Sequence, residues 1–274
     1  MSFPWLREKR LKMVWRTEKK GRTAFLVGTA HFSPYPFRKS LRELIRSVED
    51  VLFEGPLDPE SMAKVTQHGR HSGETPSLDE ALEPSVIKEI NERLNVPSIP
   101  YRSAESYLEL FTSSRSNFLE SHVKGVRPWM AFFTLWSSYL NWHYSMDLEA
   151  FHIAQKMRKK VHFLETTEEQ LAALDGIPFE GIVDYVNRFE HWKLYKEQFL
   201  KDFLRGDLEK LMSRTTKFPT RCESVLGHRD ERLFGRMKTF FEKGSAIAFL
   251  GLSHLPAIKK MFIREGYEVT QYVT

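Results

Sequence analysis

Two histidines occupy the same local setting in this chain although they lie far apart in the sequence. Ala24-Phe-Leu-Val-Gly28-Thr-Ala-His31 and Ala248-Phe-Leu-Gly251-Leu-Ser-His254 are both apolar runs that end in Gly-x-x-His. Such a run predicts a buried strand, and glycine lets the chain turn where the strand ends. The carboxyl ends of strands border the ligand crevice of an open α/β sheet. We therefore expect His31 and His254 to face one pocket, with their rings on the order of 4–8 Å apart.

Two carboxylates follow predicted strands in the same way. Val51-Leu-Phe-Glu54 and Val161-His-Phe-Leu-Glu165 each run from apolar residues into a glutamate. Because consecutive strands usually neighbour one another, we expect Glu54 to lie closer to His31 than Glu165 does. Glu165 also precedes a predicted capping box at 167–170, so it either takes part in the site or anchors that helix.

Imidazoles and carboxylates at one sheet edge predict two kinds of chemistry. His31, Glu54, His254 and Glu165 could hold a divalent ion such as Mn, Co or Zn and leave positions open for water. Without a metal, a carboxylate could act as general base and a histidine as acid or oxyanion partner. Arg229, at the start of a predicted helix, is either a group that stabilises developing negative charge or a surface arginine.

Other candidate residues have simpler interpretations. His68 and His71 are three residues apart in a polar loop with a glycine between them, which favours a solvated loop over a metal site. His143 and Asp147 could share a helix face, but a capping interaction around Asp147 is simpler. Cys222 is the only cysteine, which excludes an intramolecular disulfide and fits a reducing compartment, and an inert thiol is favoured over a nucleophile.

The elements that must position the site alternate between strand and helix. Residues 13–17 and 23–28 predict a β-hairpin. Apolar residues at helical spacing then precede the strand 51–54, and helices are expected at 84–95, 182–213, 230–243 and from Pro256, before a last strand at 268–273. This order predicts an α/β fold with a central mixed sheet flanked by helices.

The segment from Glu105 to Lys160 is mostly helical in pattern and rich in aromatic residues. They include Trp129, Phe132, Phe133, Trp136 and Tyr139. We expect a helical insertion that covers the active face or forms a subunit interface of a homo-oligomer, with plain core as the alternative. The chain of 274 residues is expected to form a single domain, 1–274, that includes this insertion.

Composition limits the class of partner. The net charge of +5 could indicate nucleic acid, but Glu8 and Glu18 interrupt the basic stretch and no nucleic-acid-binding signature accompanies it, so we expect no such partner. The densest apolar run, 129–136, is far shorter than the roughly 20 residues that span a bilayer. The N-terminus lacks the apolar segment of a signal peptide. We expect a cytoplasmic protein without a membrane span.

Several of these features together resemble the TraB/GumN (PrgY-related) family. The residues that carry the resemblance, in chain order, are Gly28-Thr-Ala-His31, Glu54, Arg127-Pro-Trp129, Met146-Asp147, Leu164-Glu-Thr-Thr-Glu-Glu-Gln170, Arg205-Gly-Asp207, Arg229-Asp230 and Gly251-Leu-Ser-His254. They span nearly the whole chain in the right order.

The resemblance implies an α/β fold in which both Gly-x-x-His motifs and a glutamate form one site. The family is related to the Tiki membrane metalloproteases, with which divalent-metal dependence is associated, and more distantly to erythromycin esterases and haem-binding ChaN lipoproteins. By position, the functional candidates are His31, Glu54 and His254, followed by Glu165 and Arg229. The chain departs from the pattern at Phe32-Ser33 and Asp230, and it lacks the Tiki membrane anchor, so a Wnt-like substrate at a membrane is not expected.

The sequence thus predicts a metal-dependent hydrolase, foremost a peptidase, that acts on a peptide or a small ester or amide. His31, His254 and a carboxylate would hold the ion that activates water, with Glu54 as ligand or general base. One alternative is an esterase-like hydrolase that needs no metal. The other is a protein that binds haem or a peptide signal without turnover.

Overall fold

The computed structural model describes residues 8–70, 76–94 and 118–273. Its sheet has the strand order β4-β3-β5-β2-β1-β6. The central strands β2 (Arg22–Thr29), β3 (Asp50–Phe53), β4 (Lys160–Phe163) and β5 (Ala246–Gly251) run parallel. β1 (Val14–Lys19) pairs antiparallel with both β2 and β6 (Glu268–Gln271).

The predicted hairpin is confirmed as β1 and β2. Lys20 and Gly21, between the two strands, both have positive φ, at 51° and 74°. Positive φ at both central residues is typical of a two-residue hairpin turn, whose backbone twist matches the twist of the two strands that it joins. The hairpin thereby directs β2 toward His31 beside the central strand β5.

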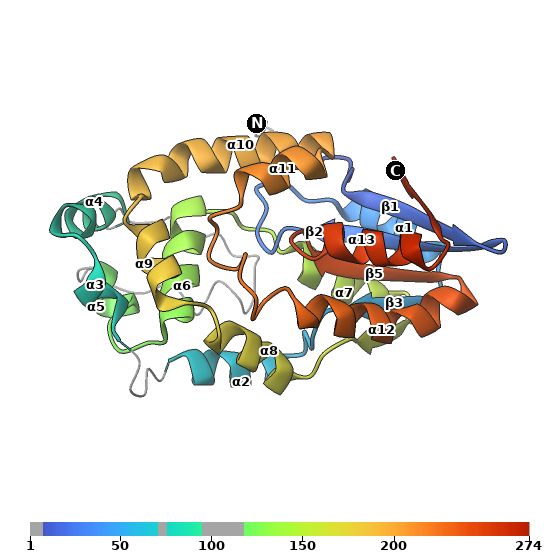
Figure 1. Ribbon diagram of the computed structural model, residues 1–274, viewed down its shortest axis with the longest axis horizontal. Coiled ribbons are helices and arrows are strands. Elements are labelled where there is room, and N and C mark those ends of the chain that lie inside the picture. The colour runs from blue at the N-terminus through green and yellow to red at the C-terminus, as the bar shows by residue number, and fades with distance from the viewer. Residues whose placement is uncertain (1–7, 71–75, 95–117, 274) are drawn as a thin grey trace.

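Helices cover both faces of the sheet (Figure 1). α1 (Arg38–Arg46) and α7 (Met146–Lys156) pack together on one face, and α12 (His228–Lys243) and α13 (Leu255–Arg264) lie on the other. A parallel sheet covered on both sides is built from continuous apolar strands. All six residues of β5 are accordingly buried.

A second group of helices gathers beyond the carboxyl ends of the parallel strands (Figure 1). It comprises α2 (Pro59–Gly69), α3 (Leu78–Ala81), α4 (Pro84–Leu94), α5 (Phe118–His122), α6 (Pro128–Leu140), α8 (Thr167–Asp175), α9 (Phe179–Val186), η3 (Phe189–His191), α10 (Trp192–Arg205) and α11 (Leu208–Arg214). These helices, which we call the helical body, enclose a second hydrophobic core, although the end of α10 and α11 bury Phe203, Leu208 and Leu211 in the core of the sheet. Its buried aromatic residues include Trp129, Phe132, Trp136 and Trp192.

The α/β fold with a mixed sheet flanked by helices is confirmed, but the limits expected for the helical insertion are wrong. Residues 105–117 lie outside the described part of the chain. α5 and α6 belong to the helical body, whereas α7 buries Met146 and Ala150 in the sheet core. α7 therefore belongs to the sheet layer. The core of the helical body is completed instead by α9, η3 and the start of α10, together with Ile177 and Val225. No helix in the described ranges is long and apolar enough to cross a membrane.

Candidate active site

The predicted site residues come together at the carboxyl edge of the parallel strands. His31 follows β2, Glu54 directly follows β3, Glu165 follows β4, and His254 follows β5. Arg229 reaches the same edge from the first turn of α12. Because β3, β5 and β2 are adjacent in the sheet, Glu54, His254 and His31 start from neighbouring strand ends.

Gly251 leaves open the space that these residues share. A Cβ atom on Gly251 would lie 3.2 Å from Oε1 of Glu54, 3.7 Å from Cδ2 of His254 and 3.9 Å from Nε2 of His31. The two imidazoles and the carboxylate thus border one small space. Any side chain at position 251 would intrude on it.

Each histidine is oriented by an aspartate. Nδ1 of His254 lies 2.5 Å from Oδ1 of Asp230, and Nδ1 of His31 lies 3.1 Å from Oδ2 of Asp147. A carboxylate only accepts hydrogen bonds, so each Nδ1 carries the proton. Nε2 of each ring is thereby directed away from its aspartate, and an imidazole nitrogen oriented in this way can bind a metal ion or a reacting proton. Nε2 of His254 also lies 3.2 Å from Nη1 of Arg229.

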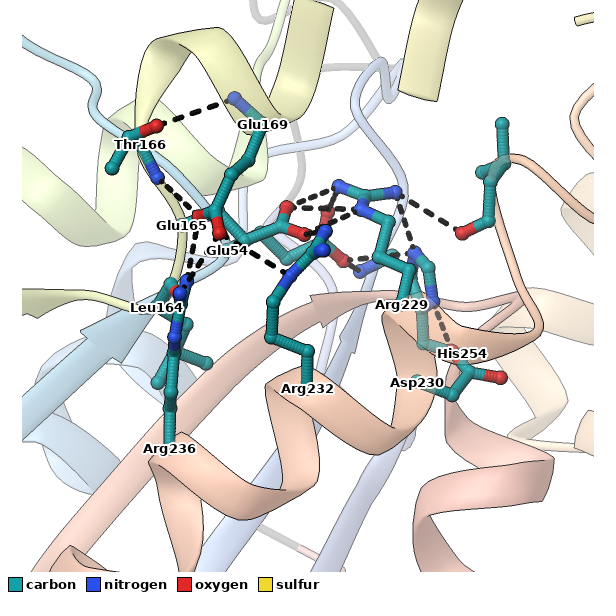
Figure 2. Close-up of polar contacts among 12 residues, drawn as sticks. Glu54, Leu164, Glu165, Thr166, Glu169, Arg229, Asp230, Arg232, Arg236 and His254 are labelled. Atoms are coloured by element: carbon teal, nitrogen blue, oxygen red, sulfur yellow. Dashed lines mark hydrogen bonds and ion pairs between the residues drawn. The ribbon is translucent and has the colours of Figure 1, made fainter. Parts of the chain in front are cut away.

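Arg229 links the carboxylates to His254 (Figure 2). Its Nε lies 2.9 Å from both carboxylate oxygens of Glu165, and its Nη2 lies 2.7 Å from Oε2 of Glu165 and 3.3 Å from Oε2 of Glu54. Nη1 lies 3.2 Å from Nε2 of His254. Arg229 is only 9% exposed, so the alternative of a surface arginine is wrong.

Two arginines form ion pairs with the carboxylate of Glu165. Besides Arg229, Nη2 of Arg232 lies 2.9 Å from Oε1 of Glu165 (Figure 2). The Glu165 side chain is fully buried, so these two guanidinium groups compensate its charge. A carboxylate that two arginines neutralise is a poor metal ligand. We therefore infer that Glu165 holds Arg229 in position and does not bind a metal ion.

The charges around the site shift its pKa values. Burial opposes ionisation of Glu54, but electrostatic interactions with the His254, Arg229 and His31 side chains and the hydrogen bond from the Gly251 N–H lower the pKa of this carboxyl. For His31, burial opposes the charged form, while the hydrogen bond and charge of Asp147 and the charge of Glu54 raise the pKa to about 9. The His31 side chain, 63% exposed, lines the pocket, so its exposed surface faces the ligand space.

Sequence reasoning overlooked the roles of the two aspartates. Asp147 was expected near His143 or at a helix cap, but its carboxylate contacts His31, and Ser145 caps α7 instead. Asp230 was noted only beside Arg229, yet it holds His254. One signal for Asp230 was available in the sequence. Residues 229 and 230 are consecutive in the first turn of a predicted helix, so a helix that brings Arg229 to the site also brings Asp230 there.

The remaining candidates lie in structural contacts. Nε2 of His68 lies 2.7 Å from Oδ2 of Asp175, which joins α2 to α8, and His71 lies outside the described residues. Sγ of Cys222 lies 3.3 Å from Oγ of Ser224. The capping box of α8 uses Thr166 and Glu169, one residue earlier than expected, because Thr166 is the residue with extended backbone before the helix.

A pocket of about 340 Å³ opens above the site. Its volume is in the range of small-molecule sites, roughly 300–1,000 Å³. His31, Glu54, Arg229, Gly251 and His254 form one part of the lining. Aromatic residues of the helical body form much of the rest, including Trp129, Phe133, Trp136, Tyr195 and Phe218. The aromatic segment expected to cover the pocket therefore lines it and also supplies core.

The donors at this edge suit a divalent ion in type. His31, Glu54 and His254 provide two imidazole nitrogens and a carboxylate, a set that leaves open coordination positions. Within the described ranges, no three His, Cys, Asp or Glu side chains form a ready-made metal cluster.

The polar site lies at the carboxyl ends of the parallel strands, beneath an aromatic pocket. This arrangement is typical of α/β proteins that bind a small ligand at the edge of the sheet. The chain belongs to the TraB/PrgY/gumN family, whose sequence model matches residues 13–271. The resemblance inferred from the motifs is thereby confirmed at the level of this family. A comparison with curated proteins gave no match.

Proposed function

We propose that this protein is a hydrolase that activates water at His31, Glu54 and His254 with the help of a divalent metal ion. The observation that carries the proposal is the pairing of each histidine with an aspartate through Nδ1. Nε2 of His31 borders the space beside Glu54, and Nε2 of His254 lies 3.6 Å from Oε1 of Glu54, although Nη1 of Arg229 also contacts it. Imidazole nitrogens held in this way suit a metal site or an acid–base site. A peptide is the first candidate substrate, followed by a small ester or amide.

His31, Glu54 and His254 would hold the ion, and Glu165 would not. The chemistry that such an ion supplies is Lewis acidity, which polarises a carbonyl group and makes water a stronger nucleophile near neutral pH. Asp147 and Asp230 hold the imidazoles in position from the far side of each ring. Arg229 keeps Glu54 ionised and remains close enough to stabilise negative charge on a reacting carbonyl oxygen.

Two observations favour a second candidate, hydrolysis without a metal. Arg229 already contacts Nε2 of His254, and the raised pKa of His31, about 9, keeps a proton on that ring at neutral pH. In this mechanism Glu54 takes a proton from water as the water oxygen attacks the carbonyl carbon. His31 then gives its proton to the leaving nitrogen or oxygen.

Metal depletion separates the two candidates. Purified protein is treated with a chelator, then assayed on a panel of peptides and esters with and without added Mn, Co or Zn. Loss of hydrolysis that an added ion restores supports the metal-dependent enzyme, and unchanged hydrolysis supports the metal-independent one. Glu54→Gln should abolish turnover in either case, with Glu43→Gln on exposed α1 surface as the matched control. If the wild type hydrolyses no member of the panel, the hydrolase proposal is wrong.

A further inference from the structure

One charged side chain lines the pocket away from the cluster at the strand ends. Arg221 is half-buried, and its Nη1 donates to Sδ of Met212 at 2.9 Å. A thioether sulfur is a weak acceptor. No carboxylate in the described ranges forms an ion pair with Arg221. Its guanidinium group therefore keeps donors and a positive charge that the described residues do not use.

The surroundings of Arg221 are aromatic. Tyr195 and Phe218, both in the pocket lining, stack with ring centroids 5.8 Å apart, and Trp136 packs edge-on against Tyr195 at 5.2 Å. Burial raises the pKa of Tyr195, and the charge of Arg221 opposes that rise, so the guanidinium group acts on the phenol. A cation at an apolar wall is incompletely solvated, which makes an anionic ligand favourable there.

Arg229 cannot provide the same contact as readily. Its guanidinium group is committed to Glu165, Glu54 and His254. Two other pocket-lining residues are acidic and repel an anion: Glu54 at the end of β3 and Asp147 in the first turn of α7. A ligand carboxylate is therefore favoured at Arg221.

We propose that the pocket binds an apolar substrate that bears a carboxylate, with its apolar part against Trp136, Tyr195 and Phe218 and its carboxylate on Arg221. Arginine presents paired N–H donors that match the two oxygens of a carboxylate. The inference rests on the proposed function for the position of the reacting bond, which lies toward His31 and Glu54. The substrate class is an ester, amide or peptide with an apolar side chain and a free carboxylate.

Calorimetric binding of phenylbutanoate and its neutral analogue phenylbutanamide tests the proposal without any turnover. The wild type should bind the carboxylate about 10-fold more tightly, the size expected for hydrogen bonds to charged groups. Arg221→Gln should abolish this preference, and Arg221→Lys should keep part of it, because lysine retains the charge but not the paired donors. Arg264→Gln, on the exposed end of α13, is the matched control and should leave both affinities unchanged.

Three results overturn the inference: equal wild-type affinities for the two compounds, a preference that survives Arg221→Gln, or no binding of either compound at millimolar concentration. A surviving preference would place the carboxylate on His31 or Arg229 instead. The comparison of the two ligands on the wild type remains decisive even if a variant does not fold. An Arg221-dependent preference without hydrolysis of any ester or peptide would refute the proposed function and leave this inference standing.

Discussion

Nη1 of Arg229 lies 3.2 Å from Nε2 of His254, the imidazole nitrogen that its Asp230 partner leaves free. One buried guanidinium group thus contacts the second Gly-x-x-His motif, Glu54 and Glu165. Its position depends on Glu165, which approaches it from the end of β4. The integrity of the site therefore depends on a buried ion pair outside the reacting groups.

Glu165→Gln should destabilise the protein by about 3–5 kcal/mol, because it leaves the buried Arg229 without its main counter-charge. Chemical denaturation of the variant and the wild type measures the loss. Glu43→Gln, at an exposed position on α1, should change stability by less than about 0.5 kcal/mol. A Glu165→Gln protein as stable as the control would show that Arg229 does not need this partner.

Asp230→Asn and Asp147→Asn should each lower kcat/KM by about 10- to 100-fold, the size typical for groups that orient a ligand or catalytic histidine. The amide can accept at its oxygen or donate from its nitrogen, so it no longer imposes one tautomer on the ring. Nitrogen-15 shifts of the imidazole rings report the tautomer directly. Unchanged tautomers together with unchanged rates would argue against an orienting role.

Gly251→Ala should preserve the fold and lower the rate on the order of 100-fold. Its methyl group would lie 3.2 Å from Oε1 of Glu54 and enter the space between the histidines. Displacement of reacting groups by about 1 Å can cost that much. Gly235→Ala, where a Cβ meets nothing within 4 Å, is the control and should keep full activity. The interpretation fails if both variants are equally active.

Glu169 should make stability depend on pH in the acid range. The hydrogen bond from Arg236 lowers the pKa of Glu169 from 4.5 to about 2 in the folded protein, with burial opposing the shift. Because the folded pKa is the lower one, the stabilisation is complete above pH 4.5 and is lost as pH falls through about 2. The difference in unfolding free energy between wild type and Glu169→Gln should shrink over this window, and a constant difference would contradict the assignment.

Much of the site could be predicted because it depends on where strands end. His31, Glu54 and His254 each follow an apolar run, and parallel strands bring such positions to one edge. The contact between His31 and Asp147 could not be predicted, since it depends on how α7 packs against α1. The place of Arg221 in the pocket wall could not be predicted either, because it lies in the non-helical segment between α11 and α12, which has no periodic pattern in the sequence.

The fold, like the site, could be predicted only in part. Strand and helix patterns predicted the α/β class, but periodicity does not tell which core receives a helix. α7 and α6 are both apolar helices within the segment expected to form one insertion, and they pack into different cores. The partner of an amphipathic helix is decided by tertiary contacts, for which a single sequence carries little signal.

Both parts of the molecule line the pocket, with Glu54 and His254 carried by the sheet and Trp136 by the helical body. Substitutions in the helical body can therefore reshape what the pocket accepts while the reacting groups stay fixed on their strands. Mutations in the helical body and mutations at the strand ends of the sheet can therefore be selected separately. Under the proposed function, such a chain can keep one chemistry and change its substrates, because the residues proposed to recognise the ligand and those proposed to react with it are stabilised by different parts of the molecule.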